Sequence, residues 1–233
     1  MDVIWEGIGQ ALRLILSGDP DLLQIVFLSL VVSGSATVLS IIIGIPYGTL
    51  LALNRFAGRS FMLGLVNTGM GMPPVVVGLV LSIFLWRSGP LGFLNMLYTP
   101  VAMVVAQFLI ATPIVTGVSM AAIAQLDPKL RLQILGLGAS RLQLLWVLFQ
   151  EARLPLLTAV MAGFGGVISE VGSVIMVGGN IKGQTRVLTT AIVTETGRGS
   201  FGLAMALGVI LLALAFGANL VLTLLQQKGR PIH

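Results

Sequence analysis

Charged residues are scarce in this sequence. Only 9 % of its 233 residues are Asp, Glu, Lys or Arg, whereas 56 % are hydrophobic and the mean hydropathy is +1.03. Soluble domains carry roughly a quarter charged residues, so this chain has too few to cover a water-facing surface. The net charge of +5 is small and scattered along the chain, which gives no indication of nucleic-acid binding.

Cysteine is absent, and histidine occurs once, as the final residue His233. Without cysteine, neither a disulfide framework nor a thiolate metal site can form. A lone terminal histidine is typical of a tail rather than of a ligand. Metal catalysis and serine–histidine chemistry therefore lack their residues, and we expect no metal site, no resident cofactor and no enzymatic activity on this chain.

Long apolar runs dominate what is present. A membrane-spanning helix needs about 20 mostly apolar residues, and five segments meet this requirement: 22–53, 61–86, 100–123, 154–178 and 201–225. Within hydrocarbon every backbone polar group must be satisfied inside its own segment, so these runs must be helices. An outer-membrane barrel would show short alternating segments instead. The sequence predicts an all-α integral membrane protein with one transmembrane domain over residues 1–233.

Residues 1–20 do not resemble a cleaved signal peptide. Asp2 and Glu6 occupy the position of the basic region, and no small-residue cleavage site follows. Apolar residues recur at helical spacing, as at Ile8 and Leu12. This pattern predicts an amphipathic helix that lies at the membrane surface.

Lysine and arginine set the predicted orientation. They gather between the first two spans, in segment 127–153 and after the fifth span, and five spans place these three segments on one side. Cytoplasmic loops carry the excess of Lys and Arg, so we expect the N-terminus outside and the C-terminus in the cytoplasm. Lys182, Arg186 and Arg198 depart from the rule on the outer side, which the passage of an anion there would explain.

Segment 127–153 is predicted to form two short cytoplasmic helices. Asp127 and Pro128 supply an N-cap and a first helical residue, Gly136 and Gly138 allow a sharp turn, and Ser140 can cap a second helix. Such a loop would make a compact docking surface. A plain amphipathic connector is the alternative.

The turn resembles the cytoplasmic coupling motif of ABC importer permeases. Leu154 and Pro155 follow it, as in the family, but residues 132–134 replace the family's Glu-Ala-Ala and the spacing to Pro155 is about one helical turn longer. The resemblance implies that this loop contacts an ATP-hydrolysing subunit. The coupling residues that it implies are Leu137, Gly138, Ala139, Ser140, Arg141 and Pro155.

Further blocks are similar to the molybdate, tungstate and sulfate permeases. They are residues 72–78, 99–107, 164–173 and 179–192, and the resemblance covers about residues 22–225. Glycine-rich details at 168–172 and 178–181 look closest to tungstate permeases. The resemblance implies import of a tetrahedral oxyanion across the cytoplasmic (inner) membrane, with tungstate favoured and molybdate or sulfate as alternatives.

The same resemblance implies the partners. We expect a homodimer surrounded by membrane lipid, two ATP-binding cassette subunits that carry ATP and Mg²⁺, and an extracytoplasmic oxyanion-binding protein. No nucleic acid is expected. The alternative from another class is a secondary transporter that acts alone, but one intramembrane glutamate, five spans and no visible inverted repeat argue against it.

Glu170 is the one ionisable residue well inside a predicted span, which makes it a functional candidate. Because a carboxylate repels an oxyanion, pairing with a basic group or with backbone amides is one role, and gating is the other. Pro73 and Pro74 interrupt the second span and either line a pathway or are ordinary membrane prolines. Candidate donors to a passing oxyanion, or else contacts of a solvated outer loop with a partner protein, are Asn180, Lys182, Thr185, Arg186 and Thr189.

Overall fold

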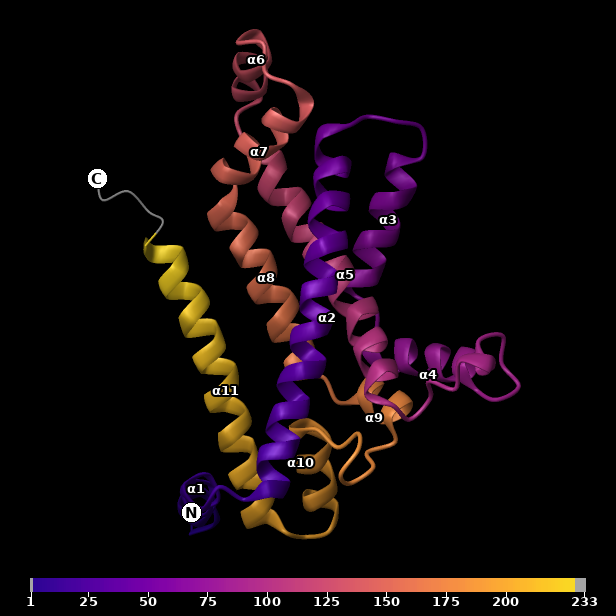
Figure 1. Cartoon of the computed structure of the whole chain (residues 1–233), viewed down its shortest axis with the longest axis vertical. Helices are drawn as coiled ribbons and strands as arrows, with labels where there is room; N and C mark the ends of the chain where they lie inside the picture. The colour runs from indigo at the N-terminus through magenta and orange to yellow at the C-terminus, as the bar shows by residue number, and fades with distance from the viewer. Residues whose placement is uncertain (1, 229–233) are drawn as a thin grey trace.

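The protein is described by a computed structural model that covers residues 2–228. Within these residues the chain is helical and contains no strand (Figure 1), which confirms the predicted all-α class. The expectations for Arg230, His233 and the C-terminus itself fall outside the described residues. The helices are α1 (Asp2–Ser17), α2 (Pro20–Leu53), α3 (Arg59–Met70), α4 (Pro74–Leu85), the short 3₁₀ helix η1 (Gly92–Leu94), α5 (Pro100–Ala124), α6 (Pro128–Gly136), α7 (Arg141–Glu151), α8 (Arg153–Ile168), α9 (Gly172–Gly178), α10 (Leu188–Gly197) and α11 (Phe201–Lys228).

Three helices are individually long and apolar enough to cross a membrane. They are α2, α5 and α11, which cover the predicted spans 22–53, 100–123 and 201–225. Two bent pairs qualify when each pair is taken as one crossing: α3 with α4, bent by 103°, and α7 with α8, bent by 72°. The chain is therefore a multi-pass membrane protein with up to five crossings.

The second and fourth predicted spans are not continuous helices. Span 61–86 is interrupted after Met70, where Gly71 ends α3 and Pro73 precedes α4. Proline lacks a backbone N–H and restricts the residue before it, so a helix ends at such a pair. Span 154–178 is interrupted at residues 169–171, between α8 and α9. Helix α10, in the connection between α9 and α11, was not predicted.

Helices α2 and α5 form the centre of the bundle, and small residues bring them together. A Cβ on Gly48 would lie 2.5 Å from the carbonyl oxygen of Thr116, and a Cβ on Gly44 would lie 3.0 Å from Val115. Such residues let membrane helices approach closely without a large side chain between them. Helix α5 also contacts α3, α4, α8 and α9, so it organises the bundle.

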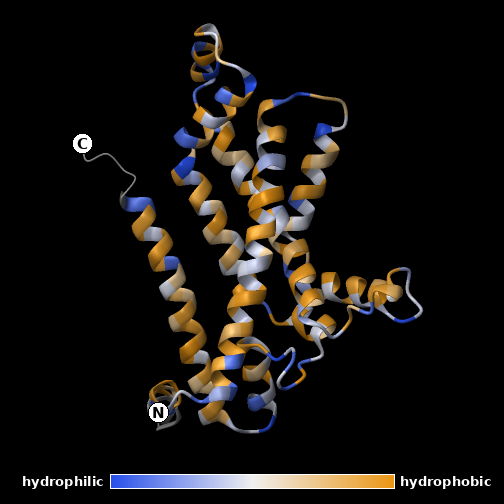
Figure 2. Cartoon of the chain, viewed as in Figure 1, coloured by the Kyte–Doolittle hydropathy of each residue, from blue (hydrophilic) through white to orange (hydrophobic). Residues whose placement is uncertain are grey.

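The two ends of the bundle differ. In Figure 1, α6, α7 and the α2–α3 connection lie at one end, whereas α1, α10 and the first turns of α2 and α11 lie at the other. Helix α4 projects sideways. Figure 2 shows mainly hydrophobic residues along the long helices and hydrophilic residues concentrated in the connections. This distribution fits helices that pass through hydrocarbon and connections that reach water.

Candidate functional site

The α6–α7 turn is built by its local sequence. Gly138 has φ +82, a left-handed conformation that favours glycine. Its N–H donates to the carbonyl oxygen of Leu135 at 3.0 Å and closes the turn. Ser140 then begins α7 with a capping box, because its N–H donates to Gln143 Oε1 at 2.8 Å and its Oγ accepts from the N–H of Gln143. The two short helices and the glycine turn are present as predicted.

Large apolar side chains surround this turn and are exposed. Leu137 is 89 % exposed, Leu142 is 79 % exposed and Trp146 is 62 % exposed. These three side chains, with Leu132, form what we call the apolar knob, and it stands at the α6–α7 end of the bundle. Large exposed apolar side chains such as these mark surfaces that contact a protein partner or the membrane.

The knob is fixed to the bundle rather than loosely attached. Arg131 Nη1 of α6 donates to the carbonyl oxygen of Leu53 at 2.9 Å and so satisfies the C-terminal end of α2. At the α7–α8 junction, Ala152 and Leu156 are buried against Ala122 and Ile123 of α5. Pro155, the last coupling residue implied by the resemblance, is exposed in the first turn of α8. The α6–α7 segment is therefore attached to α2 through Arg131 and to α5 through the α7–α8 junction.

At the other end of the spans, α4 and α9 pack together. A Cβ on Gly78 would lie 2.6 Å from Ser173 Cα, and one on Gly172 would overlap Val75. Ser82 Oγ donates to the carbonyl oxygen of Gly78 at 2.7 Å and lies 3.1 Å from that of Met176. Since Val75 is in the first turn of α4, where Pro73 and Pro74 lie, and Gly172 begins α9, the two helix breaks are neighbours.

Glu170 lies in the second break and holds the start of α9. Its Oε1 accepts the Ser173 backbone N–H at 2.9 Å and lies 3.3 Å from Ser173 Oγ. Its main-chain oxygen accepts from Thr189 Oγ1 at 3.0 Å. Of the two roles left open by the sequence, this geometry supports the structural one, because the carboxylate caps a helix with donors from the backbone and a hydroxyl.

Most of the candidate anion donors in segment 180–189 already have partners. Thr185 is fully buried, and its Oγ1 donates to the carbonyl oxygen of Gly178 and accepts from the Ile181 N–H. Asn180 Nδ2 contacts Thr194 Oγ1, and Asn180 Oδ1 accepts from Arg186 Nε at 3.2 Å. These bonds order the loop rather than point donors into a pathway.

Lys182 pairs with a carboxylate of α2. Its Nζ is 2.6 Å from Asp21 Oδ2 in an exposed ion pair between the α9–α10 loop and the first turn of α2. A cavity of about 210 Å³ beside this pair is lined by Asp19, Asp21, Lys182, Arg186 and Glu195 among apolar side chains. Three carboxylates line this cavity with two basic side chains. Because the lining is net negative, it disfavours binding of a doubly charged oxyanion.

Exposed polar residues within two of the predicted spans were missed from the sequence. On α3, Gly64, Asn67 and Thr68 are exposed and continue to Gly71, and on α8 Ser169 is exposed at the break. Asn67 and Thr68 lie within a predicted span, where polar groups face protein or water rather than lipid. The i, i+3, i+4, i+7 spacing from Gly64 to Gly71 was available in the sequence as a signal.

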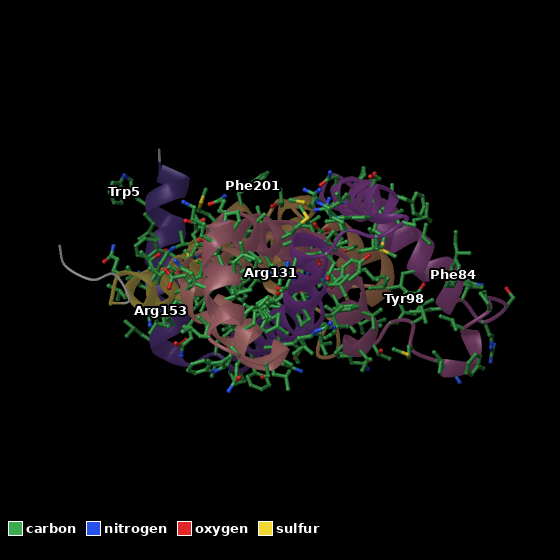
Figure 3. The ribbon with its side chains drawn as sticks, turned by 90° about the horizontal axis from the view of Figure 1, so that it is seen from above. Trp5, Phe84, Tyr98, Arg131, Arg153 and Phe201 are labelled. Carbon is green, nitrogen blue, oxygen red and sulfur yellow. The ribbon has the colours of Figure 1, made fainter. Side chains whose placement is uncertain are left out.

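Figure 3 looks onto the bundle from the knob end. Phe84 and Tyr98 lie at one edge, on the side to which α4 projects, and Trp5 and Arg153 lie toward the opposite edge. Tyr98 has φ +63, its N–H donates to the carbonyl oxygen of Val177 at 2.8 Å, and its ring covers Gly179. The connection after α4 is therefore attached to the end of α9.

Known proteins match this chain along most of its length. Residues 44–230 match the family described as "Binding-protein-dependent transport system inner membrane component". The chain is 38 % identical over 228 residues to the tungstate uptake system permease protein TupB of Peptoclostridium acidaminophilum, covering 98 % of this chain and 100 % of that protein. It is 41 % identical over 203 residues to a probable anion ABC transporter permease protein of Haloferax volcanii, covering 85 % and 88 %.

A solved structure shares the fold. A chain of the MetNI methionine ABC transporter, in an inward-facing conformation, superimposes with a TM-score of 0.74 over 90 % of this chain and 96 % of that chain. The sequence identity is 17 %, so this likeness bears on architecture and not on the transported solute.

Proposed function

Because the chain belongs to the family of binding-protein-dependent transport system inner membrane components, we propose that it is the permease subunit of an ATP-driven importer that moves tungstate into the cell. The observation that carries the substrate is the identity of 38 % to a tungstate uptake permease over the full length of that protein. Molybdate or sulfate is the alternative substrate within the same family. ATP hydrolysis belongs to a partner, and no covalent chemistry takes place on this chain.

The apolar knob is the proposed docking surface for the ATPase subunit. Leu137 is almost fully exposed and directly precedes the Gly138 turn, which suits insertion into an apolar cleft of a partner. In the complete importer two copies of this chain would carry two ATPase subunits, and a soluble oxyanion-binding protein would dock at the α1–α10 end. That the family takes its name from a binding protein supports this last partner.

The proposed orientation places the knob in the cytoplasm. Arg55 and Arg59 lie in and after the α2–α3 connection, at the same end as α6 and α7, which accords with the bias of Lys and Arg toward cytoplasmic loops. Helix α1 and the outer loop with Lys182 then face the outside.

We place the pathway between two copies, along the exposed polar residues of α3 and past the end of α8. Asn67 and Thr68 offer amide and hydroxyl groups without a formal charge, so an oxyanion could enter and leave without being trapped. Ser169 borders this pathway, but its hydroxyl already donates to the carbonyl oxygen of Gly165 at 2.9 Å. Pro73 and Pro74 shape the neighbouring break, where irregular backbone requires protein or water around it. Glu170 then acts as the support of α9 rather than as a ligand.

Uptake of tungsten, molybdenum and sulfur, measured by elemental mass spectrometry at limiting supply, tests the proposal. Cells that lack the gene should lose tungsten uptake, and the wild-type gene should restore it. Leu137→Asp should fail to restore uptake at equal protein level, whereas Leu137→Met, which keeps an apolar knob, should restore it.

Each other outcome has a definite meaning. Loss of molybdenum or sulfur instead would keep the family and move the substrate. Uptake by the purified chain in vesicles without any ATPase would contradict the importer and support a transporter that acts alone.

A further inference from the structure

Helix α1 has three distinct faces. On a helical wheel of about 100° per residue, Gly7, Ala11 and Leu14 share one face, Leu12, Trp5 and Leu16 share a second, and Gln10, Arg13 and Ser17 share a third. Among the side chains of α1 whose exposure is described, Gly7 and Ala11 on the first face are the buried ones. The apolar arc of the helix is therefore much wider than the part that the protein covers.

The first face fixes α1 to the bundle. Ala11 is 1 % exposed and lies in one cluster with Leu22 of α2 and with Ala206, Leu207 and Ile210 of α11. A Cβ on Gly7 would lie 2.6 Å from Met205 Cβ, so the two helices approach closely here. Because the uncharged run of α2 begins at Leu22, this packing holds α1 at the level where hydrocarbon begins.

The second face is apolar and uncovered. Leu16 is 85 % exposed, Trp5 is 71 % exposed and Leu12 is 56 % exposed. Figure 3 shows Trp5 at the outer edge of the molecule, directed away from the bundle. The first turns of α2 also carry exposed apolar side chains, Leu23 and Phe27.

We propose that this second face is an anchor that inserts into the interfacial layer of the bilayer, with Trp5, Leu12 and Leu16 among the acyl chains and Arg13 toward the phosphates. Helices with a wide apolar arc and a polar face bearing a basic residue lie in the interface plane. Tryptophan is enriched at this depth because its ring is apolar while its indole N–H is polar.

Lipid is favoured over a second protein copy by the order of the faces. The polar face with Gln10, Arg13 and Ser17 directly borders the apolar one, as a boundary between water and acyl chains requires. The anchor sets the depth of the first turns of α2 and α11, because α1 packs on both. This proposal does not depend on which solute is transported. It rests on the proposed orientation only for the choice of leaflet, which is the outer one.

Tryptophan fluorescence of the full chain tests the anchor. The protein has three tryptophans, so the double variant W86F/W146F leaves Trp5 as the only one. In nanodiscs of phosphatidylcholine and phosphatidylglycerol, lipids brominated near the headgroup should quench Trp5 more than lipids brominated deep in the acyl chain. The matched control W5F/W86F leaves Trp146 on the knob, which should not be quenched by either lipid.

Two results would overturn the anchor. The first is that neither brominated lipid quenches Trp5. A blue-shifted emission would then indicate that a second copy covers the face, and a water-like emission would indicate that nothing covers it. The second result concerns the face itself. In the Trp5-only protein, Leu16→Asp should reduce quenching and Gln10→Asp should not, so equal quenching in these two variants would show that the face is assigned wrongly.

Discussion

Two glycines in the α6–α7 loop allow the cost of backbone conformation to be measured apart from the effect of side-chain space. Gly136 and Gly138 are two residues apart, and a Cβ on either would meet nothing within 4 Å. Gly136 ends α6 in a helical conformation, whereas Gly138 has φ +82. Replacing each by alanine therefore adds the same methyl group to open space, and only the conformational cost differs.

The two alanine substitutions change the conformational free energy of the loop in opposite directions. A non-glycine L-residue in the left-handed region costs roughly 1–2 kcal/mol, and asparagine tolerates that region better than alanine. Alanine at the helical position gains about 0.5–1 kcal/mol over glycine. Since nothing packs on the turn, the Gly138→Ala loop can relax away from the strained conformation. Docking on the ATPase subunit must then restore it.

We expect the affinity of Gly138→Ala protein for its ATPase subunit to fall by about 5- to 30-fold, because each 1.4 kcal/mol is a factor of ten. Gly138→Asn should fall less, and Gly136→Ala should bind at least as well as the wild type. Titration of the ATPase subunit against nanodisc-embedded variants measures the series. Equal affinities for Gly138→Ala and Gly136→Ala would refute both the strained turn and its role in docking.

Further variants probe the packing and the break. Gly48→Ala should lower the melting temperature in detergent, because a Cβ there meets the Thr116 carbonyl oxygen at 2.5 Å and overpacking costs about 1–3 kcal/mol. The control Gly34→Ala adds a methyl group to open space on the same helix and should not lower it. Glu170→Gln should retain uptake and thermal stability because an amide oxygen can still accept the Ser173 N–H, whereas Glu170→Ala should lower both by loss of a cap worth about 0.5–2 kcal/mol. Lys182→Met should leave thermal stability nearly unchanged, since exposed ion pairs contribute little. A large loss of stability would show instead that the ion pair between Lys182 and Asp21 stabilises the α9–α10 loop.

The long helices could be predicted because one physical signal decides them. An uncharged run that is long enough to cross hydrocarbon must be helical, and charges mark its ends. The α6–α7 loop was equally accessible, because an N-cap before a proline, a glycine turn and a serine cap are all local. In both cases the residues that determine the structure lie within the segment itself.

The bends were less accessible because contacts between distant segments set them. Gly71, Pro73 and Pro74 mark a break, but its angle of 103° depends on the packing of Gly78 against Ser173, which no local pattern contains. The break at Glu170 carries no proline at all.

Helix α10 was missed because its threonines favour other structures. In the folded chain Thr194 and Thr196 donate to carbonyl oxygens four residues earlier in the helix, at 2.8 Å each. Among the site residues, the sequence grouped Asn180, Lys182 and Thr189 as anion donors by proximity along the chain. The structure gives them separate partners: Thr194, Asp21 and the main chain of Glu170.

Helix α8 is the element that links the proposed docking surface to the proposed pathway. It begins at the 72° bend after α7, where Ala152 and Leu156 are buried against α5, and it ends at the break that Glu170 caps. Its 16 residues span about 24 Å at 1.5 Å per residue, which is most of the hydrocarbon thickness of about 30 Å. In the proposed importer, a shift of the knob on ATPase closure would therefore be passed along α8 toward Ser169 and the α4–α9 layer.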